Sequence, residues 1–419
     1  KALMIARGVS AKMFFHSLFC KDQSHSRGRQ MSAHISDHER NILSMVGPVG
    51  NNALQAAGVA MSIKNDSEKP IVLCAMGDGT TQEGERLEAI AEAVRWELPV
   101  LFVVEDNQWA ISTQTRGKTF FSRPDGEATE FYGIPIIKID GRNVIEAYDV
   151  FGKVVTEMRL SRKPKIILFK AERLSNHTNA DDQRIYRSKD DIEKVQKDSD
   201  PISFLEKKLL TWGLNIDEIQ DAKDRIFNEV KNAAEESQRS PDPKPCFIAK
   251  KELPAFLKPE SEEYIGNPDK KELTMLEAIR QVLNERMALD SNVTLYGQDI
   301  EDPKGDVFGL TRGLTEAYPT QVLNAPLAES SIVGMGVGRA LAGDKPVVFL
   351  QFADFLPIAF NQIVSEMGSI YWRTDGGWQV PLIVMITCGG YRPGLGPFHA
   401  QTFESLGAHT PGVDVMMPS

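Results

Sequence analysis

The chain has 419 residues, of which 42% are hydrophobic and 25% charged, and its formal net charge is -10 at pH 7. This composition excludes a chain that is disordered throughout, and the length is sufficient for two or three domains with hydrophobic cores. The sequence has no basic stripe to attract nucleic acids or anionic membranes. It also has no hydrophobic run near the roughly 20 residues that a membrane-spanning helix needs, so we expect neither kind of partner.

The four cysteines lie far apart in the sequence, with no Cys-x-x-Cys pair and no zinc-finger spacing: Cys20, Cys74, Cys246 and Cys388. This pattern favours a reduced, cytoplasmic protein. The first residues, "KALMIARG", do not begin with Met and show no secretion signal. We expect that the sequence is a fragment whose first residues are missing.

Short β-branched runs recur from residue 71 onwards in the first part of the chain. Four of them predict strands: "IVLCAM" (71–76), "VLFVVED" (100–106), "IIKI" (136–139) and "KIILFKA" (165–171). Amphipathic helical stretches separate the first two runs and the last two, as parallel βαβ units require. We therefore expect an α/β fold with a doubly wound, mostly parallel sheet and flanking helices.

A segment with fewer strand signals divides this region from a second one. A charged helical stretch leads to residues 240–270, whose Pro and charge content is typical of a linker or a wrap-around arm. The pattern then restarts with a predicted helix at 273–289 and predicted strands at 293–299, 322–326, 347–355 and 381–390. The sequence therefore predicts two α/β domains, at residues 1–239 and 271–419, with a linker at 240–270.

Polar residues end two neighbouring predicted strands. "GDGTTQ" places Asp78 between Gly77 and Gly79, and "EDNQ" places Asn107 at the end of the next strand. Because the crossover helix returns the chain in the same direction, both strand ends face the edge where open α/β sheets hold ligands. With a backbone carbonyl and two diphosphate oxygens, the Asp78 carboxylate and the Asn107 amide suit Mg²⁺. The glycines let backbone amides approach phosphate.

Each of these features also has an ordinary structural explanation. A lone Gly-Asp-Gly is most often a turn, and an Asn after a strand is most often a cap. Their combination within one βαβ unit favours a site for a metal and a diphosphate. The stretch "GMGVGRA" (334–340) lacks the G-x-G-x-x-G spacing of nucleotide motifs, so close helix packing explains it better.

Six stretches in family order resemble the thiamine-diphosphate-dependent first component of 2-oxoacid dehydrogenase complexes. The spacing from Asp78 to Asn107, 107 minus 78 or 29 residues, is similar to the thiamine diphosphate motif. "RGRQMSAH" and "HTNADDQRIYR" resemble the alpha subunit, whereas "NAPLAESSIVGMGVGRALAG", "QFADF", "GPFHAQ" and "AHTPGVDVMMPS" resemble the beta subunit. The resemblance implies a fused alpha/beta chain with two thiamin-diphosphate-binding-fold domains.

The resemblance implies a role for each matching residue in binding Mg²⁺ and the diphosphate. Asp78 and Asn107 match metal ligands, and the backbone carbonyl of Trp109 completes that set. Gly79 and Thr80 match residues that lie against the diphosphate. These five residues are the expected anchor for the charged end of the cofactor.

The resemblance also implies contacts with the cofactor's pyrimidine ring. Gly47 and Val49, in "GPVGNN", match a loop that touches this ring, and Phe355, in "QFADF", matches an aromatic packed on it. Glu329, in "PLAES", matches the acid that bonds a ring nitrogen and favours the proton transfer that activates the cofactor. Without the family match, a Glu at a helix start is more often a surface charge or a cap.

His177 and His399 match two active-site histidines, one from each half of the chain. Histidines near their working pKa suit the positioning of a substrate carboxylate and the delivery of a proton. The implied reaction is oxidative decarboxylation of a 2-oxoacid, with transfer of the acyl group to the lipoyl arm of a dihydrolipoamide acyltransferase. The implied assembly is at least a dimer of fused chains.

The paired acids of "HTNADD" and the stretch "GRQMSAH" favour a branched-chain substrate such as 2-oxoisovalerate, and pyruvate remains an alternative. Two further alternatives are another thiamine enzyme of the transketolase type and a non-catalytic scaffold with the same fold. Thr178 lies in a stretch similar to a loop that kinases phosphorylate in mitochondrial relatives.

The chain departs from the family pattern at several positions. Asp106 stands where a second Asn is common, Gln351 stands where Glu is more common, and Ala400 stands where Ser is usual. Asp106 is expected to add negative charge near the metal. A Tyr-Arg pair that precedes "KALMIARG" in the family and a third, C-terminal transketolase-type domain are absent from this sequence.

Overall fold

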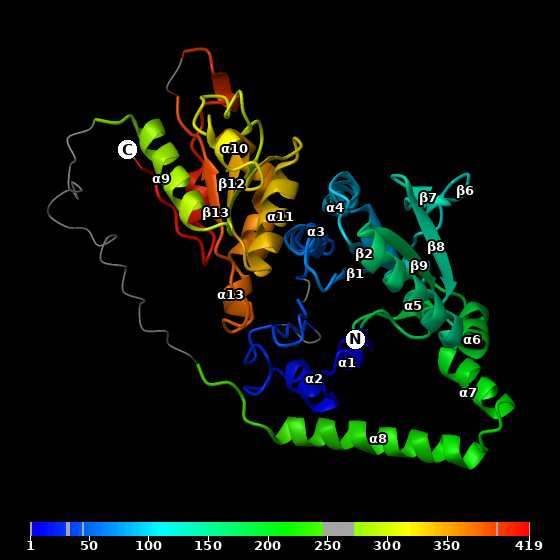
Figure 1. Cartoon of the computed structure of the whole chain (residues 1–419). Helices are drawn as coiled ribbons and strands as arrows, with labels where there is room; N and C mark the ends of the chain where they lie inside the picture. Colours follow the sequence, from blue (N-terminus) through cyan, green and yellow to red (C-terminus); the bar gives the residue numbers. More distant parts are fainter. Residues whose placement is uncertain (1, 31–33, 44–45, 246–271, 391–392, 419) are drawn as a thin grey trace.

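The structure of the protein, a computed structural model, describes residues 2–30, 34–43, 46–245, 272–390 and 393–418. Two separate parallel sheets, one in each half of the chain, are the main features (Figure 1). Most of the predicted linker at 240–270 lies outside the described residues, as does Cys246. The domain boundaries predicted from the sequence therefore stay a proposal.

The first sheet has five strands in the order β1-β2-β9-β8-β7. All pairs are parallel except β7 with β8. The strands are β1 (Val72–Gly77), β2 (Val100–Asp106), β7 (Glu130–Phe131), β8 (Ile134–Asp140) and β9 (Lys165–Lys170). The helices α4 (Gly84–Arg95) and α5 (Val144–Ser161) provide the crossovers within the pairs β1–β2 and β8–β9. The four predicted strands and the mostly parallel sheet are confirmed.

The central strand β2 shows why its sequence is apolar without alternation. Phe102 and Val104 belong to a core that includes α3 and α4, whereas Leu101 and Val103 belong to a second core with α5. Because successive side chains of a strand point to opposite faces, a strand covered on both faces must be apolar throughout. The first sheet is therefore a layer between helices.

Short elements that the sequence pattern did not predict extend this half. Two-residue strands form small hairpins: β3 (Trp109–Ala110) with β4 (Thr113–Gln114), and β5 (Ser122–Arg123) with β6 (Gly126–Glu127). The helices that flank the sheet in sequence are α1 (Ala2–Ala6), α2 (Ala11–Leu18), α3 (Asn52–Ser62), α6 (Lys189–Asp198), α7 (Pro201–Thr211) and α8 (Ile216–Arg239). A strand of two residues is too short to show a periodic hydrophobic pattern, so the sequence does not indicate it.

The second sheet has four parallel strands in the order β11-β10-β12-β13. They are β10 (Val293–Gly297), β11 (Val322–Asn324), β12 (Lys345–Leu350) and β13 (Ile383–Ile386). The helices of this half are α9 (Met275–Leu289), α10 (Leu314–Ala317), α11 (Glu329–Leu341), α12 (Leu356–Asn361), α13 (Ile370–Arg373) and α14 (Glu404–Ala408). The second predicted α/β domain is thus confirmed as a parallel sheet with flanking helices.

The two halves meet along α3 and α11, which lie side by side between the sheets (Figure 1). A Cβ on Gly58 of α3 would lie 2.2 Å from the carbonyl oxygen of Met335, and a Cβ on Gly338 of α11 would lie 2.1 Å from that of Gln55. Only glycine allows the two backbones to come this close. One hydrophobic core contains residues of both halves, and close helix packing, as predicted, explains "GMGVGRA".

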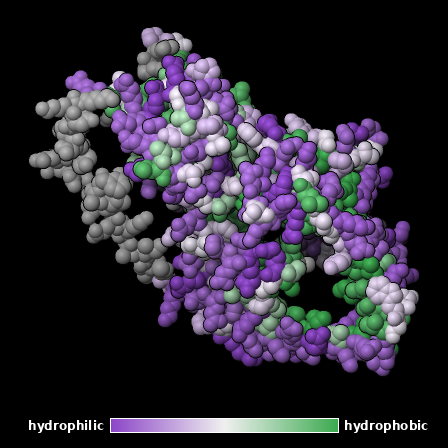
Figure 2. Space-filling view, viewed as in Figure 1, coloured by the Kyte–Doolittle hydropathy of each residue, from purple (hydrophilic) through white to green (hydrophobic). Residues whose placement is uncertain are grey.

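The described surface is largely hydrophilic in the view of Figure 2, but hydrophobic side chains gather around a hollow beside α7 and α8. Large hydrophobic residues that these two helices and their junction expose include Ile202, Leu210, Trp212, Ile226 and Phe227. Within the described residues, we find no helix that combines the length and the hydropathy needed to cross a membrane.

Candidate active site

The ends of β1 and β2 bring the two expected metal ligands to one edge of the first sheet. The strands are parallel, and Gly77 pairs with Glu105 in their register. Asp78 therefore follows Gly77 at the same level as Asp106, and Asn107 comes one residue later. The shared edge predicted from the sequence is present, while the binding of a metal there stays a prediction.

Asp78 is a buried carboxylate without a basic partner among the described residues. Its side chain is 2% exposed, and its Oδ2 accepts a hydrogen bond of 2.7 Å from the hydroxyl of Thr115. The hydroxyl of Thr81 donates to the Asp78 carbonyl at 2.7 Å and fixes the turn. Burying an unpaired carboxylate is costly unless a cation compensates it, so this environment fits a hard divalent ion.

The turn after β2 orders the other expected ligands. The Asn107 Oδ1 accepts a hydrogen bond of 3.0 Å from the backbone N–H of Trp109, and the Asp106 Oδ1 accepts one of 3.1 Å from that of Gln108. Burial raises the pKa of Asp106, and the negative charge of Asp78 raises it further. Asp106 is thus close enough to Asp78 to be affected by its charge, while the expectation that Asp106 adds negative charge near a metal stays a prediction.

The expected diphosphate residues lie next to this turn. A Cβ on Gly79 would lie 2.6 Å from the Cβ of Ala110 in β3, so packing alone already requires glycine there. The loop that contains Gly47 and Val49 is exposed. At its end, a Cβ on Gly50 would lie 3.7 Å from the Cγ2 of Thr80. The structure thus brings the "GPVGNN" loop close to the turn that contains Gly79 and Thr80.

Glu329 begins α11 at the boundary between the two halves. It is half-buried, and its Oε1 accepts a hydrogen bond of 2.9 Å from the side-chain amide of Gln298, which follows β10. Burial raises the pKa of Glu88 on α4, and the charge of Glu329 contributes to that rise. The hydroxyl of Ser331 donates to Glu88 at 2.8 Å, so the start of α11 packs against the helix that follows Asp78.

Phe355 and His399 lie together in the second half. Their rings have an edge-to-face geometry with centroids 5.8 Å apart, and His399 makes a similar contact with Phe352 at 4.8 Å. His399 is exposed, whereas Phe352 is buried. Gln351, where Glu is more common in the family, is buried, and its amide donates to the carbonyl of Gln298. This residue therefore supports the strand end that holds Glu329.

His177 lies on an exposed loop after β9, and contacts of this loop reach the hairpin β3–β4. Its backbone N–H donates to the Asp181 Oδ2 at 2.8 Å, and the hydroxyl of Tyr186 donates to the same oxygen at 2.7 Å. Both bonds lower the pKa of Asp181, and the bond from the His177 backbone has the larger effect. The Tyr186 ring lies 5.5 Å from that of Trp109, and Arg173 donates to its hydroxyl. None of the contacts among the described residues joins His177 to His399.

Three supporting contacts were not predicted from the sequence, which marked Asp181 only as one of the paired acids of "HTNADD". Thr115 holds Asp78, Gln298 holds Glu329, and Asp181 holds the backbone of His177. Gln298 lies near the end of the strand predicted at 293–299 and directly follows β10 in the structure, as Asp78 follows β1, so the strand-end signal could have found it. Thr115 lies in a hairpin of two-residue strands and has no comparable signal.

The profile of the family described as "Dehydrogenase E1 component" matches residues 1–246, which is more than half of the chain. The chain belongs to this family. A second profile, "Transketolase, pyrimidine binding domain", matches residues 271–419. The two matches confirm the predicted pair of thiamin-diphosphate-binding-fold domains and the fusion of an alpha-type with a beta-type part.

Relatives of both subunit types match the chain. The 2-oxoisovalerate dehydrogenase subunit beta of Bacillus subtilis is 39% identical over 148 residues, 35% of this chain and 45% of the relative. The human mitochondrial 2-oxoisovalerate dehydrogenase subunit alpha is 28% identical over 268 residues, 62% of this chain and 59% of the relative. The pyruvate dehydrogenase E1 component subunit alpha of Porphyra purpurea is 30% identical over 247 residues, which are 57% of this chain and 71% of the relative. The chain spans about half the length of the first two.

Proposed function

We propose that the chain is the first component of a 2-oxoacid dehydrogenase complex and acts with thiamine diphosphate and Mg²⁺ on a branched-chain 2-oxoacid such as 2-oxoisovalerate. The observation that carries the proposal is the buried carboxylate of Asp78, which has no basic partner among the described residues and lies at the sheet edge that it shares with Asn107. The family membership and the presence of both subunit types on one chain support it.

The proposed metal and diphosphate anchor lies in the first half. Asp78, Asn107 and the carbonyl of Trp109 would hold Mg²⁺, and Gly79 and Thr80 would lie against the diphosphate. These oxygen ligands suit a hard cation that also binds phosphate oxygens. Among the described residues, no cluster of three or more His, Cys, Asp or Glu could hold a metal.

The proposed pyrimidine contacts come from both halves. When bound, thiamine diphosphate supplies the carbon nucleophile that adds to the 2-oxo group and accepts the electrons that decarboxylation leaves. Glu329, held by Gln298, would keep a proton at a pyrimidine nitrogen. Gly47, Val49 and Phe355 would contact the ring.

His177 and His399 would orient the substrate carboxylate and deliver a proton during acyl transfer. Both side chains are exposed on loops. Exposure also leaves room for a lipoyl arm, which we propose as the acyl acceptor on a dihydrolipoamide acyltransferase. Residues on loops over a rigid sheet edge are a common arrangement in enzymes.

We further propose a cytoplasmic homo-oligomer, at least a dimer of fused chains. The exposed hydrophobic residues of α7 and α8, of which Phe227 is 68% exposed, support an assembly with a second copy, because monomers rarely expose such clusters. Gel filtration with light scattering measures this directly. A mass of one chain would contradict the proposed dimer.

The substrate is the finer part of the proposal, with pyruvate as the second candidate. The beta-type half matches a 2-oxoisovalerate dehydrogenase subunit at 39% identity, and the alpha-type half matches relatives of both kinds at 28–30%. The preference for a branched-chain substrate therefore depends on the stretches "HTNADD" and "GRQMSAH". A pocket that gains or loses a methylene discriminates by about 1–3 kcal/mol. We therefore expect kcat/KM for 2-oxoisovalerate to exceed that for pyruvate by about tenfold or more.

The test follows reduction of an artificial electron acceptor by the full-length chain with thiamine diphosphate, Mg²⁺ and either 2-oxoacid. A preference for pyruvate would overturn the substrate assignment alone. Ketose transfer without 2-oxoacid turnover would support the transketolase-type alternative. No turnover with any 2-oxoacid would contradict the dehydrogenase function and favour the scaffold.

A further inference from the structure

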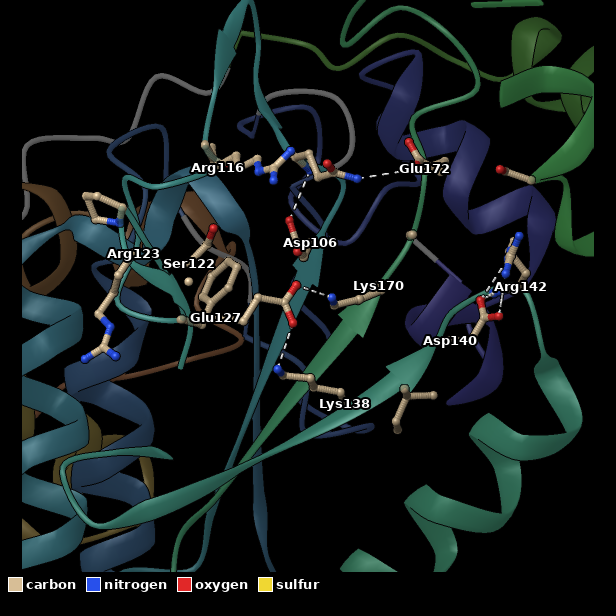
Figure 3. A pocket seen from close by; sticks show the side chains of 18 residues that line it. Asp106, Arg116, Ser122, Arg123, Glu127, Lys138, Asp140, Arg142, Lys170 and Glu172 are labelled. Carbon is tan, nitrogen blue, oxygen red and sulfur yellow. Dashed lines mark hydrogen bonds and ion pairs between the residues drawn. The ribbon is translucent and has the colours of Figure 1, made fainter. Parts of the chain in front are cut away.

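A cavity of about 680 Å³ lies beside the candidate active site at the carboxyl ends of β2, β8 and β9 (Figure 3). None of the residues predicted for metal or cofactor binding lines it. Thr115, whose hydroxyl holds Asp78, belongs to the wall between the two. This volume falls within the range of small-molecule sites, and the carboxyl edge of a parallel sheet is where α/β folds bind ligands.

Most charges of the cavity wall neutralise each other. Glu127 pairs with Lys138 at 2.8 Å and with Lys170 at 2.5 Å, and these two lysines lower the pKa of Glu127 to about 2. Asp140 pairs with Arg142 at 2.8 Å. These groups build the wall and have little remaining capacity for a charged ligand.

Three charged lining side chains form no ion pair in the described parts of the chain: Arg116, Glu172 and Asp106. The Asp106 Oδ1 accepts a hydrogen bond from the backbone N–H of Gln108, so Arg116 and Glu172 are the two of opposite charge that could meet a ligand. Arg116 forms no hydrogen bond or ion pair with another residue in the described parts of the chain. Glu172 accepts one hydrogen bond of 3.2 Å from the amide of Gln108 and pairs with no described cation. Burial raises the pKa of Glu172, as expected for a carboxylate that lacks a partner. Figure 3 shows Arg116 on one side of Asp106 and Glu172 on the other.

The wall also offers an apolar surface. Pro124 in the lining is exposed, whereas Phe121 and Ile139, which also line the cavity, are only 2% and 1% exposed and add little surface of their own. A ligand that fills this space can therefore bury an aliphatic group while its charged ends reach Arg116 and Glu172. An anion alone would leave Glu172 unpaired, and a cation alone would leave Arg116 unpaired.

We propose that this cavity binds a small aliphatic amino acid as a zwitterion, with its ammonium group at Glu172 and its carboxylate at Arg116. The site is separate from the proposed catalytic function and does not depend on it. Charge-assisted hydrogen bonds at both ends would fix the orientation of the ligand.

The test is isothermal titration calorimetry of the full chain with L-valine and L-leucine. Two analogues of L-leucine, 4-methylpentanoate and 3-methylbutylamine, each lack one of the charges. We expect saturable binding of at least one amino acid, and at least about tenfold weaker binding of both analogues, because each loses one charge-assisted contact. Equal binding of either analogue, or no binding of both amino acids up to about 10 mM, a weak affinity by any measure, would overturn the proposal.

Matched substitutions locate the binding. We expect Glu172→Gln and Arg116→Gln each to weaken amino acid binding about tenfold. The same exchanges outside the cavity, Glu130→Gln on β7 and Arg159→Gln on α5, should leave it unchanged. Circular dichroism verifies that all four variants fold. Binding that survives both cavity substitutions would place the ligand elsewhere and contradict the assignment.

Discussion

Two acids of the candidate site are held by neutral side chains. Thr115 donates to Asp78, and Gln298 donates to Glu329. A neutral donor orients a carboxylate without cancelling its charge, so the acid stays available for a cation or a proton. At the scale of single residues, Thr115 and Gln298 therefore orient the two acids, and the acids themselves carry the chemistry that we propose.

The role of Thr115 predicts the effect of removing its hydroxyl. Thr115→Val keeps the side-chain shape but removes the hydrogen bond to Asp78, and bonds to charged groups contribute about 1.5–3 kcal/mol. We expect affinity for Mg²⁺ in the presence of thiamine diphosphate to fall about tenfold or more. Thr113→Val, at an exposed position of β4, serves as the control. Equal affinities in the two variants would show that Thr115 does not position Asp78.

Glu329→Ala separates cofactor binding from cofactor activation. Because the proposed anchor for the metal and the diphosphate lies in the other half, we expect this variant to bind thiamine diphosphate within a few-fold of the wild type. Loss of the carboxyl should abolish exchange of the thiazolium proton, which NMR in D₂O measures. Glu316→Ala, at an exposed position of α10, should exchange normally. Full exchange in Glu329→Ala would contradict the proton-transfer role.

At the scale of elements, α3 and α11 join the halves through close backbone contact. A methyl group on Gly338 would meet the Gln55 carbonyl at 2.1 Å, whereas nothing lies within 4 Å of a Cβ on Gly152 in α5. We expect Gly338→Ala to lower the free energy of unfolding by about 1–3 kcal/mol. Gly152→Ala should raise it by about 0.5–1 kcal/mol. Urea denaturation measures both, and an unchanged Gly338→Ala midpoint would contradict the tight packing.

The sequence predicted the elements that carry a periodic signal. The runs at β1, β2, β8 and β9 were placed to within about two residues because a strand buried on both faces must be apolar. The hairpins β3–β4 and β5–β6 were missed because two-residue strands have no period. The glycines of α11 indicated that another helix packs closely but could not name α3 as that helix.

Within the candidate site, too, the residues that could be predicted are those that a strand pattern places. Asp78 and Asn107 could be placed together because parallel strands end at one edge. The assignment of Glu329, Phe355 and His399 depended on resemblance, since a single residue carries no spacing. Thr115 follows the short strand β4 and contacts Asp78, 37 residues earlier in the sequence, a contact that only the folded structure reveals.

At the scale of the whole molecule, the candidate site that we propose includes residues of both halves of the chain. The first half contributes the acidic strand end, and the second contributes Glu329 at a helix start that packs against α4. The shared hydrophobic core between the halves fixes this arrangement. A fused chain therefore places alpha-type and beta-type residues together without a separate assembly step.

The central claim is that Asp78 and Asn107 share an Mg²⁺ ion that anchors a diphosphate. Titration of the chain with thiamine diphosphate, with and without Mg²⁺, tests it most directly when wild type, Asp78→Ala and the exposed control Asp149→Ala are compared by calorimetry. We predict Mg²⁺-dependent binding in the wild type and in Asp149→Ala, and none in Asp78→Ala, because the cation loses its buried carboxylate. Unchanged affinity in Asp78→Ala, or wild-type binding that is independent of Mg²⁺, would contradict the claim.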